Sequence, residues 1–140
     1  MFMDRQNLFS SAQAVTTGST ASTDVIDLGS VRDIGAGEEL EVIVVIDTTF
    51  TSGGSGTMDF KLQTDSAVGF GTVTTLFSTG AIAVATLVAG YSVARWKIPR
   101  GVSRYLRMQY VVATADMTAG TITSGISIGR QDTAVYADAL

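Results

Sequence analysis

The chain contains neither histidine nor cysteine. Histidine is the commonest general base near neutral pH and a frequent zinc ligand, and cysteine supplies thiolate nucleophiles and disulfides. Catalysis by a histidine or cysteine arrangement is therefore excluded. Packing, or association with other chains, must hold the fold together.

Carboxylates are the acid–base groups considered next. Glu38, Glu39 and Glu41 follow a glycine-rich turn, and Asp24 and Asp27 lie three residues apart. A pair of carboxylates can hydrolyse a glycosidic bond when both face one cleft at a fixed separation. Thirteen acidic residues offer such pairs by chance, so we interpret these as solvated surface groups. We expect no catalytic residue, no metal site and no cofactor.

Glycine clusters are the other feature with a known chemical use, because glycine-rich loops can cradle phosphate groups. Gly53-Gly-Ser-Gly56 and Gly69-Phe-Gly71 lack the third spaced glycine of a dinucleotide site, and the chain has no Gly-Lys-Ser/Thr phosphate loop. No segment has the ligand pattern of a calcium loop. We interpret both clusters as turns.

The charges are unevenly distributed. Residues 1–70 hold ten acidic and three basic side chains, whereas residues 71–140 hold three acidic and six basic ones. Two interpretations remain open: the halves fold against each other and neutralise locally, or a basic stripe docks on an acidic protein surface. The net charge of −4 argues against nucleic acid as a partner. The basic cluster consists of Arg95, Lys97, Arg100, Arg104 and Arg107.

Alternation of apolar and polar residues is the main structural signal. Met58, Phe60 and Leu62 alternate with polar residues, which is the period of a strand with one buried face. Together with the intervening turn residues, this pattern predicts strands at residues 25–28, 40–47, 58–63, 73–78, 81–88, 93–98, 104–112 and 121–128, with an additional one at 12–16. Eight strands in two antiparallel sheets form a jelly roll, so the predicted fold is an all-β jelly-roll sandwich, and apolar residues, 46% of the chain, can fill its core.

Three segments support more specific predictions. Residues 41–46 are apolar at nearly every position, as in a central strand that is covered on both faces. Residues 81–89 form the longest apolar stretch, which is too short to cross a membrane as a helix and is predicted to be a buried strand. Residues 52–56 are small and rich in glycine, and predict a mobile hairpin tip.

The predicted domain comprises residues 9–130, with an N-terminal arm at residues 1–8 and a C-terminal tail at residues 131–140. The arm carries Phe2, Met3 and Leu8, whose burial requires a partner or the domain's own sheet, and Arg5 suits the polar rim of such a contact. The first residues lack the basic and then apolar layout of a signal peptide, so we expect synthesis in the cytoplasm.

Aromatic residues flank the basic cluster. By strand parity Trp96 and Tyr110 belong to buried faces, whereas Tyr105 shares its face with Arg107. Tyrosine and arginine are enriched where proteins contact one another. The candidate interface residues are Phe2, Met3, Arg5, Leu8, Arg95, Lys97, Arg100, Arg104, Tyr105 and Arg107.

The order of several segments resembles the capsid cement (decoration) proteins of short-tailed DNA phages. The similarity covers about residues 7–129, and no single motif is diagnostic. The segments are Asn7-Leu-Phe-Ser-Ser-Ala-Gln-Ala-Val-Thr16, Val25-Ile-Asp-Leu-Gly29, Arg32-Asp-Ile-Gly35, Glu38-Glu-Leu-Glu-Val42, Ala85-Thr-Leu-Val-Ala-Gly-Tyr91 and the block at residues 99–126. The tail at residues 131–140 has no equivalent in this resemblance.

The resemblance implies a structural protein without enzymatic activity. Its expected place is the outer surface of the virion capsid, and its expected partners are the phage major capsid protein and further copies of itself, with a dimer favoured over a trimer. No membrane or nucleic acid is an expected partner. The alternative is a jelly-roll module on a virion surface that binds a carbohydrate or a receptor, which requires a concave site with exposed aromatic residues.

Overall fold

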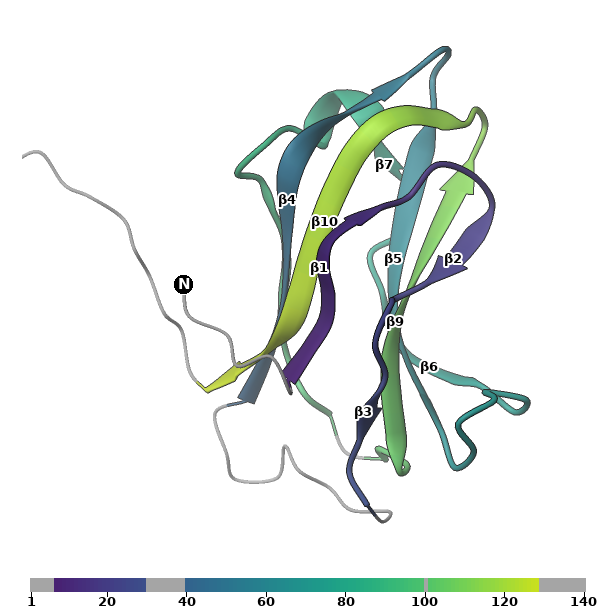
Figure 1. Ribbon diagram of the computed structural model, residues 1–140, viewed down its shortest axis with the longest axis vertical. Helices are drawn as coiled ribbons and strands as arrows, with labels where there is room; N and C mark the ends of the chain where they lie inside the picture. Colours follow the sequence, from purple (N-terminus) through teal and green to yellow (C-terminus); the bar gives the residue numbers. More distant parts are fainter. Residues whose placement is uncertain (1–6, 30–39, 100, 129–140) are drawn as a thin grey trace, which may run out of the picture.

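The computed structural model describes residues 7–29, 40–99 and 101–128, which form two antiparallel β-sheets (Figure 1). The four-stranded sheet contains, in spatial order, β1 (Leu8–Ala14), β10 (Met117–Ile128), β4 (Leu40–Ser52) and β8 (Ser92–Lys97). The second sheet contains β2 (Ser19–Ala21), β9 (Tyr105–Ala113), β5 (Thr57–Asp65) and β6 (Thr74–Ser78). Two short strands extend this second, six-stranded sheet: β3 (Ile26–Asp27) pairs with β9, and β7 (Ile82–Ala83) pairs with β5.

The first strands in the sequence pair with the last, and the strands between them pair with one another in the same order. β1 pairs with β10, β2 with β9, β4 with β8 and β5 with β6, and every pair is antiparallel. Alternate pairs in this order lie in different sheets, which is the connectivity of a jelly roll. The predicted all-β jelly-roll sandwich is therefore confirmed.

The core lies between the two sheets and follows the predicted alternation. In the six-stranded sheet Met58, Phe60 and Leu62 of β5 face inward, as do alternate residues of β9. Val42 and Ile46 of β4 meet them from the other sheet. The residues of β9 on this face are Leu106, Met108, Tyr110 and Val112. Burial of these side chains provides most of the stability, at about 25 cal/mol for each square ångström of apolar surface removed from water.

A buried polar network joins the two sheets through Tyr110. Its hydroxyl group lies 2.7 Å from the Ser10 Oγ of β1 and 2.7 Å from the Ser124 Oγ of β10. Ser10 also donates to the Gln13 Oε1, at 2.6 Å. All three hydroxyl-bearing residues of the network, Ser10, Tyr110 and Ser124, are fully buried. Each of these hydroxyl groups thus has a partner, as buried polar groups require.

β10 bends sharply near its first residues, where it pairs with the end of β4 (Figure 1). Its register against β4 shifts three times between Met117 and Ile122. Gly120 has a φ of +129°, and the ring of the buried Phe50 lies directly over its Cα, where a Cβ would come within 2.4 Å of the ring. A bend of this kind requires glycine because other residues rarely adopt this φ and no side chain fits below the ring.

Two connections between the sheets pack against each other at one end of the sandwich. β4 and β5 lie in different sheets, so residues 53–56 form a crossover, and the predicted hairpin tip is wrong. The neighbouring crossover joins β9 to β10, and Ser52 Oγ donates to the carbonyl oxygen of Asp116 at 2.8 Å. Gly56 is buried against this second crossover, because a Cβ there would lie 2.8 Å from the carbonyl oxygen of Ala115.

The prediction of a buried strand at residues 81–88 is also wrong. Only β7 is extended there, and a turn of 3-10 helix follows at Val84–Thr86. Leu87 is the one buried side chain from residue 81 to residue 89. This segment leaves β5 in one sheet and reaches β4 in the other, where Phe50 N–H donates to the Leu87 carbonyl oxygen at 2.9 Å. A chain that crosses between sheets has no partner strand along its whole length.

The other strands agree with the prediction, with different bounds. The strand predicted at residues 12–16 is β1 at Leu8–Ala14, which places Leu8 in the sheet instead of in an arm. β2 has only three residues and was not predicted. The remainder of the predicted arm and the tail at residues 131–140 lie outside the described residues.

Candidate interaction surfaces

The basic cluster is divided between two opposite faces of the sandwich. In an antiparallel sheet, paired residues point to the same side. Arg95 pairs with Ile43, between the inward-facing Val42 and Val44, and therefore points away from the core. Arg107 lies between the inward-facing Leu106 and Met108 of the other sheet. The outer surfaces of the two sheets face opposite directions, so proximity in sequence does not produce one basic stripe.

We call these surfaces the four-strand face and the six-strand face. The four-strand face comprises Leu8, Glu41, Ile43, Arg95, Lys97 and Ser127. The six-strand face comprises Asp59, Lys61, Gln63, Asp65, Tyr105, Arg107 and Gln109. Arg104 immediately precedes β9. Among the other predicted interface residues, Phe2, Met3, Arg5 and Arg100 lie outside the described residues.

At the centre of the four-strand face lies a buried apolar side chain, that of Ile43. Ile43 is 0% exposed although it points away from the core, so β4 is covered on both faces at this position, whereas Glu41 and Val45 on the same side are only partly buried. Its neighbours across the sheet are Gly125 on β10 and Arg95 on β8. One row further along, Ser127, Glu41 and Lys97 lie side by side. The face therefore surrounds a buried isoleucine with charged and hydroxyl groups.

Several polar atoms of the four-strand face are buried and have no hydrogen-bond partner among the residues that the structure describes. They are the Glu41 Oε2, the Arg95 Nη1 and the Ser127 Oγ, and the Ser127 side chain is only 5% exposed. An unpaired buried polar group costs free energy.

At the edge of the six-strand face, Arg104 forms a two-point ion pair with Asp27 of β3. Arg104 Nε donates to Asp27 Oδ1 at 2.8 Å, and Nη2 donates to Oδ2 at 3.0 Å. This hydrogen bonding, with a further bond from Gly29 N–H, lowers the pKa of Asp27 to about 2. The Arg104 guanidinium also lies 5.0 Å from the centre of the Tyr105 ring. The pair joins an acidic residue of the first half of the chain to a basic residue of the second.

The loop at residues 66–73, which we call the β5–β6 loop, is held by one carboxylate. Asp65 Oδ1 accepts the N–H of Ala67 at 3.2 Å, and Oδ2 accepts the N–H of Thr72 at 2.8 Å. The bond from Thr72, followed by those from Ala67 and Ser66, lowers the pKa of Asp65 and outweighs its desolvation. Asp65 therefore ties both ends of the loop to the last residue of β5.

Phe70 attaches the middle of the β5–β6 loop to the six-strand face. The Arg107 guanidinium lies 4.2 Å from the centre of the Phe70 ring, and Arg107 Nε donates to Gln63 Oε1 at 3.0 Å. Phe70 is 7% exposed and is separate from the main core. Burial lowers the pKa of Arg107, and the nearby Asp65 charge opposes this effect. The three side chains, Gln63, Arg107 and Phe70, form a stack on the sheet surface.

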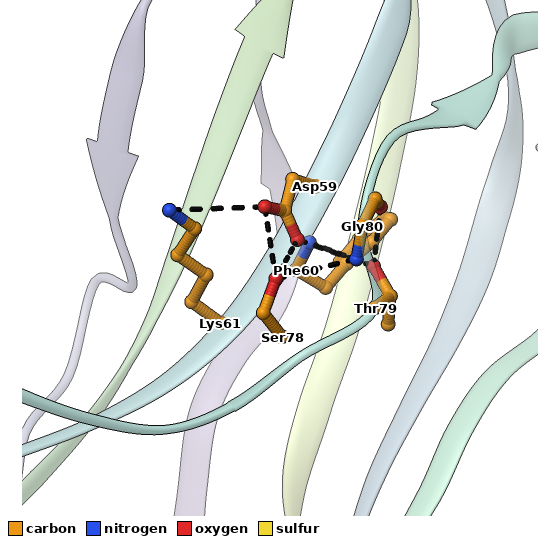
Figure 2. A network of polar contacts seen from close by, with 6 residues as sticks. All are labelled: Asp59, Phe60, Lys61, Ser78, Thr79 and Gly80. Carbon is orange, nitrogen blue, oxygen red and sulfur yellow. Dashed lines mark hydrogen bonds and ion pairs between the residues drawn. The ribbon is translucent and has the colours of Figure 1, made fainter.

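A second polar cluster on the six-strand face fixes the turn between β6 and β7 (Figure 2). Asp59 accepts hydrogen bonds from Ser78 Oγ at 2.8 Å and from Thr79 Oγ1 at 3.3 Å. Lys61 Nζ lies 3.7 Å from Asp59 Oδ2. Gly80, with a φ of +73°, completes the turn and donates its N–H to Ser78 Oγ at 3.2 Å. The cluster holds two consecutive strands on β5, so its role is structural.

The carboxylates considered for catalysis do not form a shared site within the described part of the chain. Asp24 is exposed, Asp27 is bound to Arg104, and Glu41 is on the four-strand face. Glu38 and Glu39 lie outside the described residues. Residues 7–29, 40–99 and 101–128 contain no group of three potential metal ligands. In the same residues no helix has the length and hydrophobicity needed to span a membrane.

The β5–β6 loop was not predicted as a feature of the surface. Gly69-Phe-Gly71 was recognised only as a turn, although an aromatic residue between two glycines can signal a turn that packs its ring. Asp65 and Gln63 follow the alternation of β5 and gave no separate signal. Tyr105 and Arg107 were predicted to share one outer face of their strand, and the structure agrees.

One family of proteins has a sequence model that matches this chain. The family is described as Bbp16, and the match covers residues 9–126. These residues extend from β1 into β10 and so include strands of both sheets and both outer faces. A search of curated proteins finds no match. Because the match spans most of the sequence, the chain belongs to the Bbp16 family.

Proposed function

We propose that this protein is a capsid cement protein, which binds the outside of a phage head and joins neighbouring major capsid subunits. The observation that carries the proposal is the division of the basic cluster between two opposite faces. A rigid sandwich with Arg95 and Lys97 on one side, and Tyr105 and Arg107 on the other, can contact two neighbours at once. A bridge between subunits needs two such contact faces.

The jelly roll suits this mechanical role. The six-stranded and four-stranded sheets share one continuous core, so a force applied to one face is transmitted to the other through packed side chains. Each contact can be weak, because the first attachment raises the effective concentration of the second. The sequence resemblance to cement proteins described above supports the same role, and no chemical reaction is required.

The test uses DNA-filled heads of the phage that encodes this chain, produced without it and then mixed with the purified chain. We expect the chain to sediment with the heads and to raise the temperature at which they release DNA, as followed by a fluorescent dye. Heads that bind no chain, or that release DNA at the same temperature with it, would contradict the proposal. Retention on a glycan array without binding to heads would favour the carbohydrate-binding alternative.

We also expect the purified chain to form a symmetric dimer. Two equivalent capsid subunits present the same binding surface, and the two chains of a symmetric dimer can each bind one of them. Two-fold symmetry is also the commonest symmetry of homo-oligomers. Light scattering coupled to size-exclusion chromatography measures the mass directly. A mass of one chain, 14.6 kDa, at high micromolar concentration would refute this expectation, and three times that mass would indicate a trimer.

A further inference from the structure

β8 lies at the edge of the four-stranded sheet, and within the described residues no strand pairs with its outer side. Ile98, which follows β8, donates its N–H to the carbonyl oxygen of Leu40, directly across from it in the register of β8 with β4. Backbone groups alternate along an antiparallel pair, so those of Trp96 also point to β4, whereas those of Arg95 and Lys97 point away from it. The edge therefore offers the N–H and C=O groups of Arg95 and Lys97 to an added strand.

The side chains of this edge are basic and lack an acidic partner. Arg95 and Lys97 both lie on the four-strand face, and among the described residues neither forms an ion pair, although Glu41 lies opposite Lys97. If the β8 edges of two copies paired, these cations would face one another, and like charges across a strand pair are destabilising. The edge therefore disfavours a second β8 and favours a strand that carries carboxylates.

Aromatic side chains lie on the inner side of the same edge. The Trp96 ring stacks on the ring of Phe77 in β6, with 5.2 Å between the ring centres and 20° between the planes. β6 is the edge strand of the other sheet, so the stack spans the side of the sandwich between two free edges. Both side chains are only partly buried. A strand added to β8 would place alternate side chains beside Trp96, where small or apolar residues would fit best.

The tail at residues 131–140 has the alternation that this edge requires. Both carboxylates of the tail fall on even-numbered positions, and the odd-numbered positions from 133 to 139 are small or apolar. The even positions hold Asp132, Ala134, Tyr136 and Asp138, and the odd positions hold Thr133, Val135, Ala137 and Ala139. As a strand, this segment would present its carboxylates on one face and its small side chains on the other.

The end of β10 allows the tail to reach this edge. Ile128, the last residue of β10, lies opposite Leu40, and β8 ends at the same end of the sheet. β10 and β8 both run antiparallel to β4, so a segment that turns back after β10 runs antiparallel to β8. The distance from β10 to a strand beyond β8 is three strand spacings, about 14 Å. Residues 129–135 can span about 23 Å when extended, which is sufficient.

We propose that residues 135–139 of this chain add to the free edge of β8 as an antiparallel strand, with Asp138 opposite Arg95. In this register Tyr136 lies opposite Lys97, and Ala137 lies beside Trp96. The tail has no equivalent in the resemblance to cement proteins, and this gives it a role that does not depend on the function of the domain. It closes an edge whose charges prevent two copies from closing it for each other.

Amide hydrogen exchange of the full chain, followed by NMR, tests the added strand. The Arg95 and Lys97 amides should be protected in the original chain. Tyr136→Pro removes the N–H that would bond to Lys97, and it should speed exchange of both amides by about tenfold or more. Ala137→Pro is the matched control, because the N–H of that residue would point away from β8, where an edge strand tolerates proline. The Trp96 amide, directed at β4, reports the integrity of the sheet in every variant.

Charge reversal tests the pairing of Asp138 with Arg95. Asp138→Arg should speed exchange of the Arg95 amide and make Trp96, the one tryptophan of the chain, more accessible to quenching by acrylamide. Combining it with Arg95→Asp should reverse both effects, because the opposite charges are again paired. Asp132→Arg is the control, since residue 132 lies in the connection and not opposite β8.

Two results would overturn the proposal. The first is rapid exchange of the Arg95 and Lys97 amides in the original chain. The second is equal protection in the original chain and in Tyr136→Pro, which would mean that something else covers the edge. Paired cysteines then identify whose tail is bound, because the chain has no cysteine of its own. Lys97→Cys with Tyr136→Cys should form a disulfide within one chain, and a disulfide-linked dimer would instead assign the edge to the tail of a second copy and contradict the proposal.

Discussion

Replacing Gly120 by alanine is expected to destabilise the protein by about 4 kcal/mol, from the combined cost of overpacking and of an unfavourable φ. The new Cβ would lie 2.4 Å from two carbons of the Phe50 ring, far inside van der Waals contact. Phe50 is 2% exposed, so its ring has no free space into which it can turn. The φ of +129° adds strain that no rearrangement of side chains can relieve.

Denaturant unfolding followed by far-UV circular dichroism measures this loss. Gly53→Ala is the matched control, because a Cβ at Gly53 meets nothing within 4 Å and its φ is ordinary. The double variant Phe50→Leu with Gly120→Ala should lose less than the sum of the two single changes, since the smaller side chain relieves the clash. An unchanged midpoint for Gly120→Ala would show that the bend of β10 does not depend on glycine.

Replacing Tyr110 by phenylalanine is expected to cost about 1–3 kcal/mol at neutral pH, because the buried Ser10 and Ser124 hydroxyl groups both lose a partner. The change keeps the ring, which packs edge-on against Phe60 with a centroid distance of 5.7 Å. Tyr105→Phe is the matched control, since Tyr105 is only half-buried on the six-strand face. Equal stability of the original chain and Tyr110→Phe would mean that the two serines pair with each other or with water.

The same substitution should change how stability depends on pH. Burial raises the pKa of Tyr110 to about 12, although the bonds to Ser10 and Ser124 oppose the shift. The folded state therefore keeps the phenolic proton at pH values where the unfolded chain, with a pKa of about 10, releases it. The stability from this group is complete below pH 10 and declines between pH 10 and 12, by an amount approaching 3 kcal/mol. Tyr110→Phe should lack this part of the alkaline decline, and an identical decline in both proteins would contradict the assignment.

Much of the fold was predictable because strand parity is a local property. The alternation in β5 and β9 correctly placed Phe60 and Tyr110 inside, and it placed Arg107 outside. The near-continuous apolar run in β4 correctly predicted that Ile43 is covered although it faces away from the core. These conclusions need only the residues of one strand.

The rest depended on which strand pairs with which, and single strands carry no such signal. Arg95 and Arg107 are close in sequence, but β8 and β9 belong to different sheets, so their side chains point in opposite directions. The apolar run at residues 81–88 resembled a strand because alanine and valine suit either a strand or a crossover. Phe70, in its αL conformation, packs against Arg107, and the bend at Gly120 packs against Phe50, and both of these partners lie far away in sequence.

The position of β10 has a consequence for how the fold forms. Among the described strands β10 comes last in the sequence, yet it lies between β1 and β4 in the interior of its sheet. Until β10 is in place, the long strand β4 has an open edge and β1 has no neighbour in its sheet, so β1 cannot be held there by strand pairing. Partly synthesised chains therefore present an unpaired strand edge that can join another chain. Folding must wait for contacts between distant parts of the sequence, which makes it slow and leaves nascent chains exposed to aggregation.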